Sequence, residues 1–121
     1  MKTLFNITTS EDDVDRFKSA EDFEKMLKPH FDGVELMFYR EDERQIIKKE
    51  HVIGYHMQFY PTWLDFWKGN EERLLKEFDR KENWVGYYGG KGREGIVCRL
   101  KEDLKMAHQY GAEYVVFHVS E

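Results

Sequence analysis

The chain has 121 residues, the length of one ordinary domain, and its single cysteine, Cys98, excludes an internal disulfide framework and a cysteine-based zinc site. The net charge of −5 gives no support to nucleic-acid binding, and the apolar runs are too short to span a membrane. Because 16% of the residues are aromatic, the sequence has large side chains for a core, which argues against disorder. We therefore expect one folded cytoplasmic domain over residues 1–121.

Four short apolar runs have the composition of β-strands. They lie near residues 3–8, 33–39, 51–59 and 112–119. The last run is the clearest, because β-branched and aromatic residues fill it. The runs lack a clean alternation of polar and apolar residues, which is typical of strands that are covered on both faces.

Segments with helical periodicity separate these strands. The first predicted helix has Ser19 as its N-terminal cap, and the second is a short helix over residues 41–49. The third has Asn70 as its N-terminal cap, and the fourth and longest helix is predicted over residues 94–110. Gly111 then occupies the position of a left-handed C-terminal cap. The apolar stripes consist of Phe23, Met26 and Leu27, of Leu74, Leu75 and Phe78, and of Ile96, Leu100, Leu104 and Ala107. Strict alternation of strand and helix predicts a parallel sheet with right-handed crossovers.

The segment between the third and fourth strands, residues 60–111, is far longer than a crossover needs. It holds an aromatic loop at 60–67 and a glycine loop at 86–93. Long inserted loops in compact domains are usually functional. Trp63 and Trp67 are therefore candidates to stack on the face of a sugar, and ordinary packing of a long loop is the alternative.

The glycine loop carries two cations, Lys91 and Arg93. Together with backbone N–H groups they are candidates to bind a phosphate. The loop matches neither the P-loop pattern nor the dinucleotide-binding fingerprint, however. A mobile lid or a simple linker is the alternative interpretation.

Three ionisable residues lie on predicted strands, where a ligand site is expected. His56 and His118 lie near the carboxyl ends of the third and fourth strands, the edge at which parallel sheets bind ligands, and neutral imidazole is a common metal ligand. Two histidines do not complete a metal site, so histidines satisfied by hydrogen bonds are the alternative. Glu35 lies between apolar residues of the second strand. It is either a metal ligand, general base or acceptor of sugar hydroxyls, or a glutamate paired with a neighbouring Arg or Lys.

Three motifs follow one another along the chain: FDGVEL at residues 31–36, GYH at 54–56 and GAEYVVFHVS at 111–120. Their order and content resemble the second, third and fourth strands of the xylose-isomerase-like TIM-barrel superfamily. That group includes sugar phosphate isomerases and epimerases and the endonuclease-IV-like proteins, also called AP endonuclease family 2.

The resemblance implies the N-terminal half of a TIM barrel, a parallel (β/α)4 unit, because a complete (β/α)8 barrel takes about 250 residues. It implies a pocket at the carboxyl ends of the strands, with Glu35 as a catalytic residue and His56 and His118 as ligands of a divalent metal such as Zn or Mn. The remaining ligands of the family come from strands five to eight. The resemblance therefore does not imply that this chain alone holds a metal or a complete active site.

The expected function is that of the N-terminal half of a metal-dependent sugar isomerase or epimerase, acting on a sugar or sugar phosphate. One alternative is half of an endonuclease-IV-like phosphodiesterase, which the net charge disfavours. Another is a non-catalytic half barrel that associates with itself. Since a half barrel leaves strand edges unpaired, we expect self-association in either case.

Overall fold

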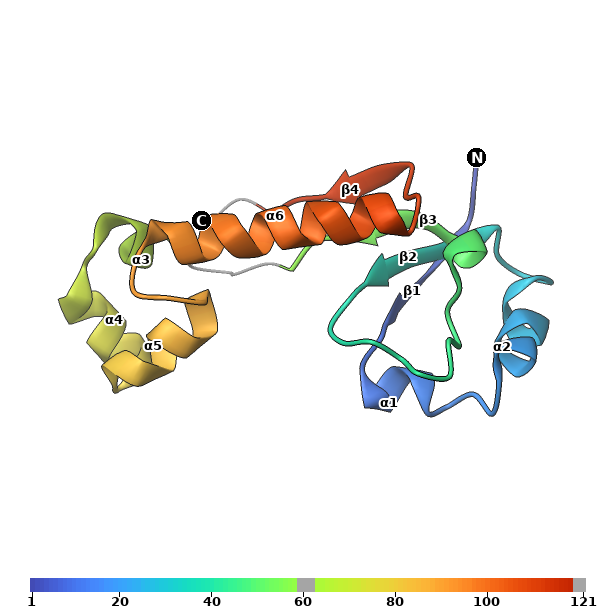
Figure 1. Cartoon of the computed structure of the whole chain (residues 1–121), viewed down its shortest axis with the longest axis horizontal. Coiled ribbons are helices and arrows are strands. Elements are labelled where there is room, and N and C mark those ends of the chain that lie inside the picture. Colours follow the sequence, from blue (N-terminus) through green and yellow to red (C-terminus); the bar gives the residue numbers. More distant parts are fainter. Residues whose placement is uncertain (59–62, 119–121) are drawn as a thin grey trace. The chain divides into compact units, whose positions relative to one another are not determined.

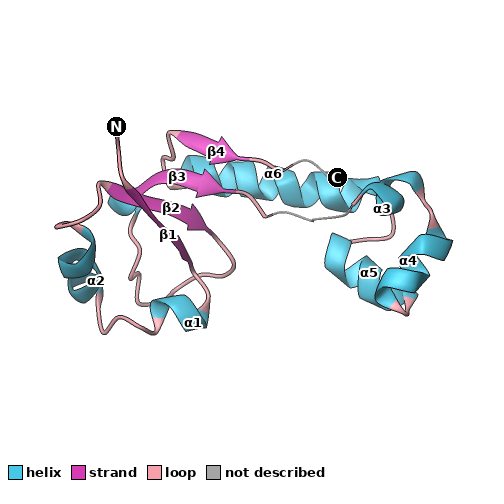
Figure 2. Ribbon diagram, turned by 180° about the vertical axis from the view of Figure 1, so that it is seen from behind, coloured by secondary structure: helices cyan, strands magenta, loops and turns pink. Residues whose placement is uncertain are grey.

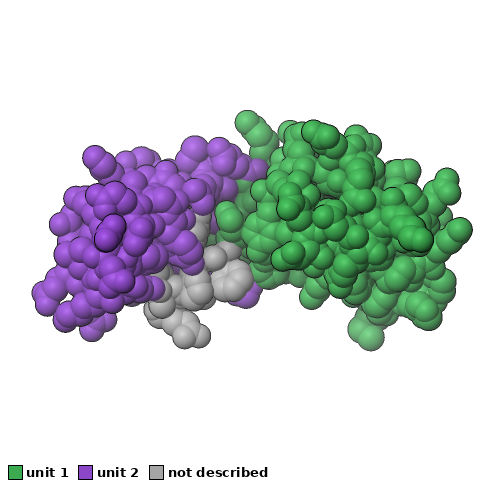
Figure 3. Space-filling model, turned by 90° about the horizontal axis from the view of Figure 1, so that it is seen from below, with its two compact units in different colours: residues 1–58, 103–117 green, residues 59–102, 118–121 purple. Residues whose placement is uncertain are grey.

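Residues 1–58 and 63–118 are described by the computed structural model (Figure 1). The chain divides into two units, coloured separately in Figure 3. The first comprises residues 1–58 and 103–117, and the second comprises residues 59–102 and 118–121. Each unit has a hydrophobic core of its own.

A four-stranded parallel sheet forms the centre of the first unit. Its strands are β1 (Leu4–Thr8), β2 (Gly33–Met37), β3 (Val52–His56) and β4 (Tyr114–Val116), in the spatial order β1-β2-β3-β4. The predicted α/β half-barrel class is confirmed: four parallel strands form an open sheet, with α-helices between β1 and β2 and between β3 and β4. The strands are shorter than predicted, and the predicted ends at residues 59 and 119 lie outside the described part of the chain.

Helices pack on one face of this sheet, which we call the covered face. Successive strand residues point to opposite sides, and the register assigns Phe5, Ile7, Val34, Leu36, Tyr55 and Val115 to the covered face. Helices α1 (Glu11–Val14) and α2 (Ala20–Leu27) contribute Val14, Phe23 and Leu27 to the core on this side. The C-terminal part of α6 (Arg93–Gln109) lies behind the strands in Figure 2, and its Asp103 accepts a hydrogen bond of 3.1 Å from the Tyr55 hydroxyl.

The opposite side, which we call the open face, is more polar. The same register assigns to it Asn6, Glu35, Gly54, His56, Tyr114 and Val116. The prediction that both faces are covered fits only one of them, because Asn6 is exposed and 41% of the surface of Tyr114 is accessible.

Two predicted helix caps are confirmed in the first unit. Ser19 Oγ accepts a hydrogen bond of 3.2 Å from the backbone N–H of Asp22 at the start of α2. At the end of α6, Gly111 has a φ of 69°, and the N–H of Ala112 bonds the carbonyl of Ala107 at 3.0 Å. A residue without Cβ suits this left-handed position, where the chain turns into β4.

The predicted helix over residues 41–49 is wrong. A single 3-10 turn, η1 (Lys49–His51), precedes β3, and the preceding chain is irregular. The Asp42 carboxylate accepts hydrogen bonds from the backbone N–H groups of Arg44 and Ile46, which competes with helical pairing. Ile46 is nonetheless fully buried, so the segment fills the core without forming a helix.

The second unit is helical. It contains α3 (Leu64–Lys68), α4 (Glu71–Phe78), α5 (Lys81–Tyr88) and the N-terminal part of α6. Its core consists of Phe66, Leu74, Trp84, Tyr88 and Ile96. As predicted, Asn70 caps α4, accepting from the N–H of Arg73 at 3.4 Å.

Some expectations for the helical segments are wrong. Each proposed loop contains helical residues: α3 begins at Leu64 in the first, whose residues 60–62 lie outside the described part of the chain, and α5 extends to Tyr88 in the second. Leu75 and Leu104, placed on apolar stripes by their spacing, are 47% and 49% exposed.

None of the helices in the described ranges is long and apolar enough to cross a membrane.

Candidate functional site

A carboxylate and a phenol meet on the open face of the sheet. The Tyr114 hydroxyl on β4 donates a hydrogen bond of 2.7 Å to Glu35 Oε2 on β2. The residue between them on β3 is Gly54, whose Cα is in register with both. A Cβ at Gly54 would lie 2.3 Å from the Tyr114 ring, so the absence of a side chain lets the ring cross β3.

Burial and this contact both favour the neutral form of the phenol. Removal of Tyr114 from water, followed by the bond to Glu35 and its negative charge, raises the pKa of Tyr114 to about 12. Tyr114 is therefore a hydrogen-bond donor at neutral pH. The expected Arg or Lys partner of Glu35 does not occur in the described part of the chain, and its partner there is a neutral hydroxyl.

Asn6 and His56 extend this polar row. Asn6 on β1 is in register with Glu35, and His56 lies two residues beyond Gly54 along β3, on the same face. The His56 Nδ1 lies 2.9 Å from the carbonyl oxygen of Met57. A carbonyl oxygen only accepts, so Nδ1 is the donor of this bond, which is the arrangement that orients the ring of many metal-binding histidines.

His118 lies outside the sheet. Strand β4 ends at Val116, so His118 follows it by two residues; its side chain is exposed, and it belongs to the second unit. The last ladder contact of this strand is the hydrogen bond of 3.0 Å from the N–H of Met57 to the carbonyl of Val116.

Three of the four predicted substrate-binding residues form a cluster in the second unit. The rings of Trp63 and Trp67 pack edge to face with centroids 5.7 Å apart. The Arg93 guanidinium lies 4.7 Å from the centroid of the Trp67 ring, and its Nε donates to the Trp67 carbonyl at 2.7 Å. Lys91 is exposed. The cation of Arg93 thus holds Trp67 in place, a role that the spacing did not reveal.

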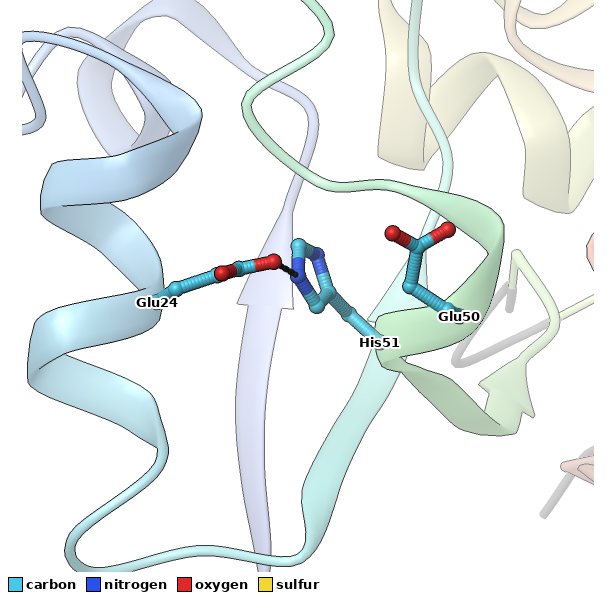
Figure 4. A group of neighbouring side chains, drawn as sticks. All are labelled: Glu24, Glu50 and His51. Carbon is cyan, nitrogen blue, oxygen red and sulfur yellow. Dashed lines mark hydrogen bonds and ion pairs between the residues drawn. The ribbon is translucent and has the colours of Figure 1, made fainter.

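A different group of potential metal ligands lies in the first unit. Glu24 on α2 and Glu50 and His51 on η1 have ligand atoms within 4.8 Å of one another (Figure 4). His51 is 4% exposed, and its Nε2 lies 2.8 Å from Glu24 Oε1. In Figure 4 a dashed line joins only Glu24 and His51, while the Glu50 carboxylate makes no such contact with either.

Both nitrogens of His51 have hydrogen-bond partners, which disfavours a metal here. The backbone N–H of Lys48 bonds His51 Nδ1 at 2.9 Å, and because an N–H only donates, Nδ1 is unprotonated. The proton is then on Nε2 and is donated to Glu24, whose pKa is lowered chiefly by this bond and next by a bond from Lys28. A metal bound at Nε2 would displace that proton. The ring would then have to carry its proton on Nδ1, which faces the backbone N–H of Lys48, and two donors would oppose each other.

The metal expected from the resemblance fits His56 better than it fits this group. The carbonyl partner of His56 Nδ1 is the usual second-shell arrangement of a metal-binding histidine. Glu35 lies on the same face, on the neighbouring strand β2. Within residues 1–58 and 63–118, neither residue belongs to a group of three closely spaced ligands.

Signals for part of this site were absent from the sequence. The sequence places Tyr114 on the fourth predicted strand but does not reveal its partnership with Glu35, which depends on the register of three strands. Comparisons of the chain with protein-family models, with curated proteins and with solved structures find no match.

Proposed function

We propose that this chain supplies one half of a carbohydrate-binding site of the isomerase or epimerase type, on the open face of its sheet. The observation that carries the proposal is the polar row of Asn6, Glu35 and Tyr114, with His56 beside it. A strand face that serves only for packing would carry apolar side chains here.

The hydrogen-bonding groups of this row match a polyol. The carboxylate of Glu35 receives one hydrogen bond from Tyr114 at Oε2, and in the described part of the chain no donor bonds Oε1. A carboxylate with remaining lone pairs accepts hydrogen bonds from sugar hydroxyls, and the Asn6 amide both donates and accepts. Together they offer acceptors and a donor on neighbouring strands.

Glu35 is the residue we assign to proton transfer. The Tyr114 hydroxyl fixes one oxygen of the carboxylate and leaves the other directed to a ligand, so a carbon acid bound on this face would lose its proton to Oε1. A divalent metal, held by His56 and Glu35 with further ligands, would polarise the carbonyl of such a sugar. His56 would contribute an imidazole nitrogen, and its Nδ1 contact with the Met57 carbonyl orients the ring.

The second unit offers a separate stacking surface. Trp63 and Trp67 form a pair of rings, and Arg93 keeps its two terminal guanidinium nitrogens beyond the Nε bond to Trp67. Rings stack on sugar faces and a guanidinium binds phosphate, which supports a sugar phosphate as ligand of this cluster.

The test is binding of D-xylose and of ribose 5-phosphate to the full chain with Zn²⁺, which is diamagnetic, followed through backbone amide NMR shifts. We expect shifts at the open-face residues Asn6, Glu35 and Gly54. Glu35→Gln keeps an acceptor for Tyr114 but removes the charge, and it should weaken binding by about tenfold. Glu21→Gln, an exposed change on α2, is the matched control and should leave binding unchanged.

Two results would overturn the proposal. One is the absence of amide NMR shifts at the open-face residues when either sugar is added in the presence of the metal ion. The other is binding that Glu35→Gln and Glu21→Gln affect equally, since that would place the ligand elsewhere. Arg93→Gln provides a further comparison, because it should weaken binding of the phosphate ester and leave that of xylose unchanged.

A further inference from the structure

A pocket of about 470 Å³ lies in the first unit, away from the open face. Its walls come from the chain after β1 and β2, from the irregular crossover that leads to β3, and from the C-terminal end of α6. We call it the crossover pocket.

Aromatic rings and carboxylates form one part of this pocket. The Phe38 and Tyr110 rings lie 6.2 Å apart, and Glu41 and Asp42 also line the cavity. Burial, then the negative charges of Glu41 and Asp42, raises the pKa of Tyr110, so both carboxylates act on the same phenol. Two carboxylates beside two π-faces form an environment that favours an organic cation.

The lysines of the lining do not cancel this preference. Lys48 and Lys49 line the same cavity, but the acidic lining residues, Glu41, Asp42 and Glu50, outnumber them by three to two. Among the described residues, neither lysine forms an ion pair. Asp42 is held in place by the N–H groups of Arg44 and Ile46, and its Oδ1 also lies 3.9 Å from Arg44 Nε, whereas Glu41 and Glu50 form no ion pair in the described part of the chain.

Thr9 adds an unused donor at the bottom of the pocket. It is 2% exposed, and its Oγ1 accepts hydrogen bonds from the N–H groups of Tyr39 at 2.8 Å and Arg40 at 3.0 Å. Both lone pairs are thereby used, while the hydroxyl proton has no acceptor within residues 1–58 and 63–118. A buried donor without an acceptor is costly, so a ligand oxygen that accepts from Thr9 would gain binding energy.

We propose that the crossover pocket binds a small aromatic ammonium compound that carries a hydrogen-bond-accepting oxygen. The ammonium group lies against Glu41 and Asp42, the ring packs with Phe38 and Tyr110, and the oxygen accepts from Thr9. This site is independent of the carbohydrate site proposed above, since it shares no residue with the open face.

The test uses three compounds of one shape and different charge: tyramine, 4-ethylphenol and 4-hydroxyphenylacetate. Each is titrated into the full chain and followed through amide NMR shifts. We expect tyramine to bind about tenfold more tightly than the anion, with shifts at Thr9, Phe38 and Tyr110. Glu41→Gln should weaken tyramine binding about fivefold, whereas Glu43→Gln, the same change two residues away and outside the lining, should not.

Three outcomes would overturn the proposal: no binding of any of the compounds, binding of 4-hydroxyphenylacetate as tight as that of tyramine, or equal effects of the two glutamine variants. Thr9→Val separates the oxygen contact from the charge contact, because it should weaken tyramine and 4-ethylphenol alike. Circular dichroism of each variant verifies that it is folded, and Thr9→Ser, which keeps the hydroxyl, should restore binding.

Discussion

The Tyr114 hydroxyl reaches Glu35 across a strand because the residue between them is Gly54. A direct neighbour of Glu35 would lie on β1 or β3, whereas Tyr114 lies two strands away and still bonds Oε2 at 2.7 Å. The bond therefore connects β2 and β4 through side chains, over β3. It also positions the carboxylate to which we assign proton transfer.

Replacing Gly54 by alanine should break this contact and destabilise the first unit. The new Cβ would approach the Tyr114 ring to 2.3 Å, and the φ of Gly54 is ordinary, so the effect is steric. We expect a loss of about 1–3 kcal/mol in the free energy of unfolding, measured by urea denaturation. Gly86→Ala is the matched control: nothing lies within 4 Å of its Cβ, and it is inside α5.

That control should have the opposite sign. Alanine in a helix interior costs less conformational entropy than glycine, so Gly86→Ala should raise stability by about 0.5–1 kcal/mol. If both variants change stability in the same direction, the steric account of Gly54 is wrong.

The raised pKa of Tyr114 predicts a loss of stability at alkaline pH. The pKa is about 12 in the folded chain against a reference of 10.0, so the phenol stabilises the fold fully below pH 10. This contribution decreases as pH rises through 12, because the unfolded chain ionises first. Tyr114→Phe should flatten the stability curve between these values, as measured by urea unfolding. Tyr39→Phe, at an exposed position, should leave the slope as in the unchanged chain.

Truncation of Glu24 tests the assignment of the Glu24 and His51 pair to structure rather than to metal binding. Glu24→Ala leaves the buried N–H of His51 without an acceptor and should cost about 1–3 kcal/mol. Glu24→Gln keeps an acceptor and should cost less. The thermal unfolding midpoint of the unchanged chain should be the same with and without a chelator, and a chelator-dependent drop would contradict this assignment.

The sequence predicted the parallel sheet and the caps at Ser19, Asn70 and Gly111, because these depend on local composition. The helix predicted over residues 41–49 does not form, because the Asp42 carboxylate accepts hydrogen bonds from backbone N–H groups that a helix would pair with carbonyl oxygens. Leu75 was predicted to lie on a buried stripe but is exposed. Periodicity shows which residues share a helix face, but it does not show how much of that face the neighbouring helices cover.

For the candidate site, the sequence identified Glu35 and His56 but not their surroundings. The Tyr114 partner depends on strand register, and the His56 tautomer depends on a carbonyl of the next residue. Neither is encoded in the spacing of the two site residues. Arg93 was expected, with Lys91, to bind a phosphate from the glycine loop, and the structure places it against the ring and the backbone of Trp67.

The predicted self-association follows from the outer edge of β4. Val115 and Phe117 are 40% and 50% exposed, and an edge strand presents unpaired backbone groups. We expect a native mass of more than one chain. Val115→Lys should shift it toward one chain, because a charged edge blocks pairing. Val97→Lys, an exposed change on α6, should not. A single-chain mass for the unchanged protein would contradict the prediction.

Paramagnetic broadening of amide NMR signals by Mn²⁺ tests the central claim most directly, that the ligand site lies on the open face beside Glu35 and His56. The account predicts broadening centred on Gly54, His56 and Met57, abolished by His56→Ala and retained in Glu50→Gln. Broadening centred on Glu24 and His51, lost in Glu50→Gln and unaffected by His56→Ala, would contradict it.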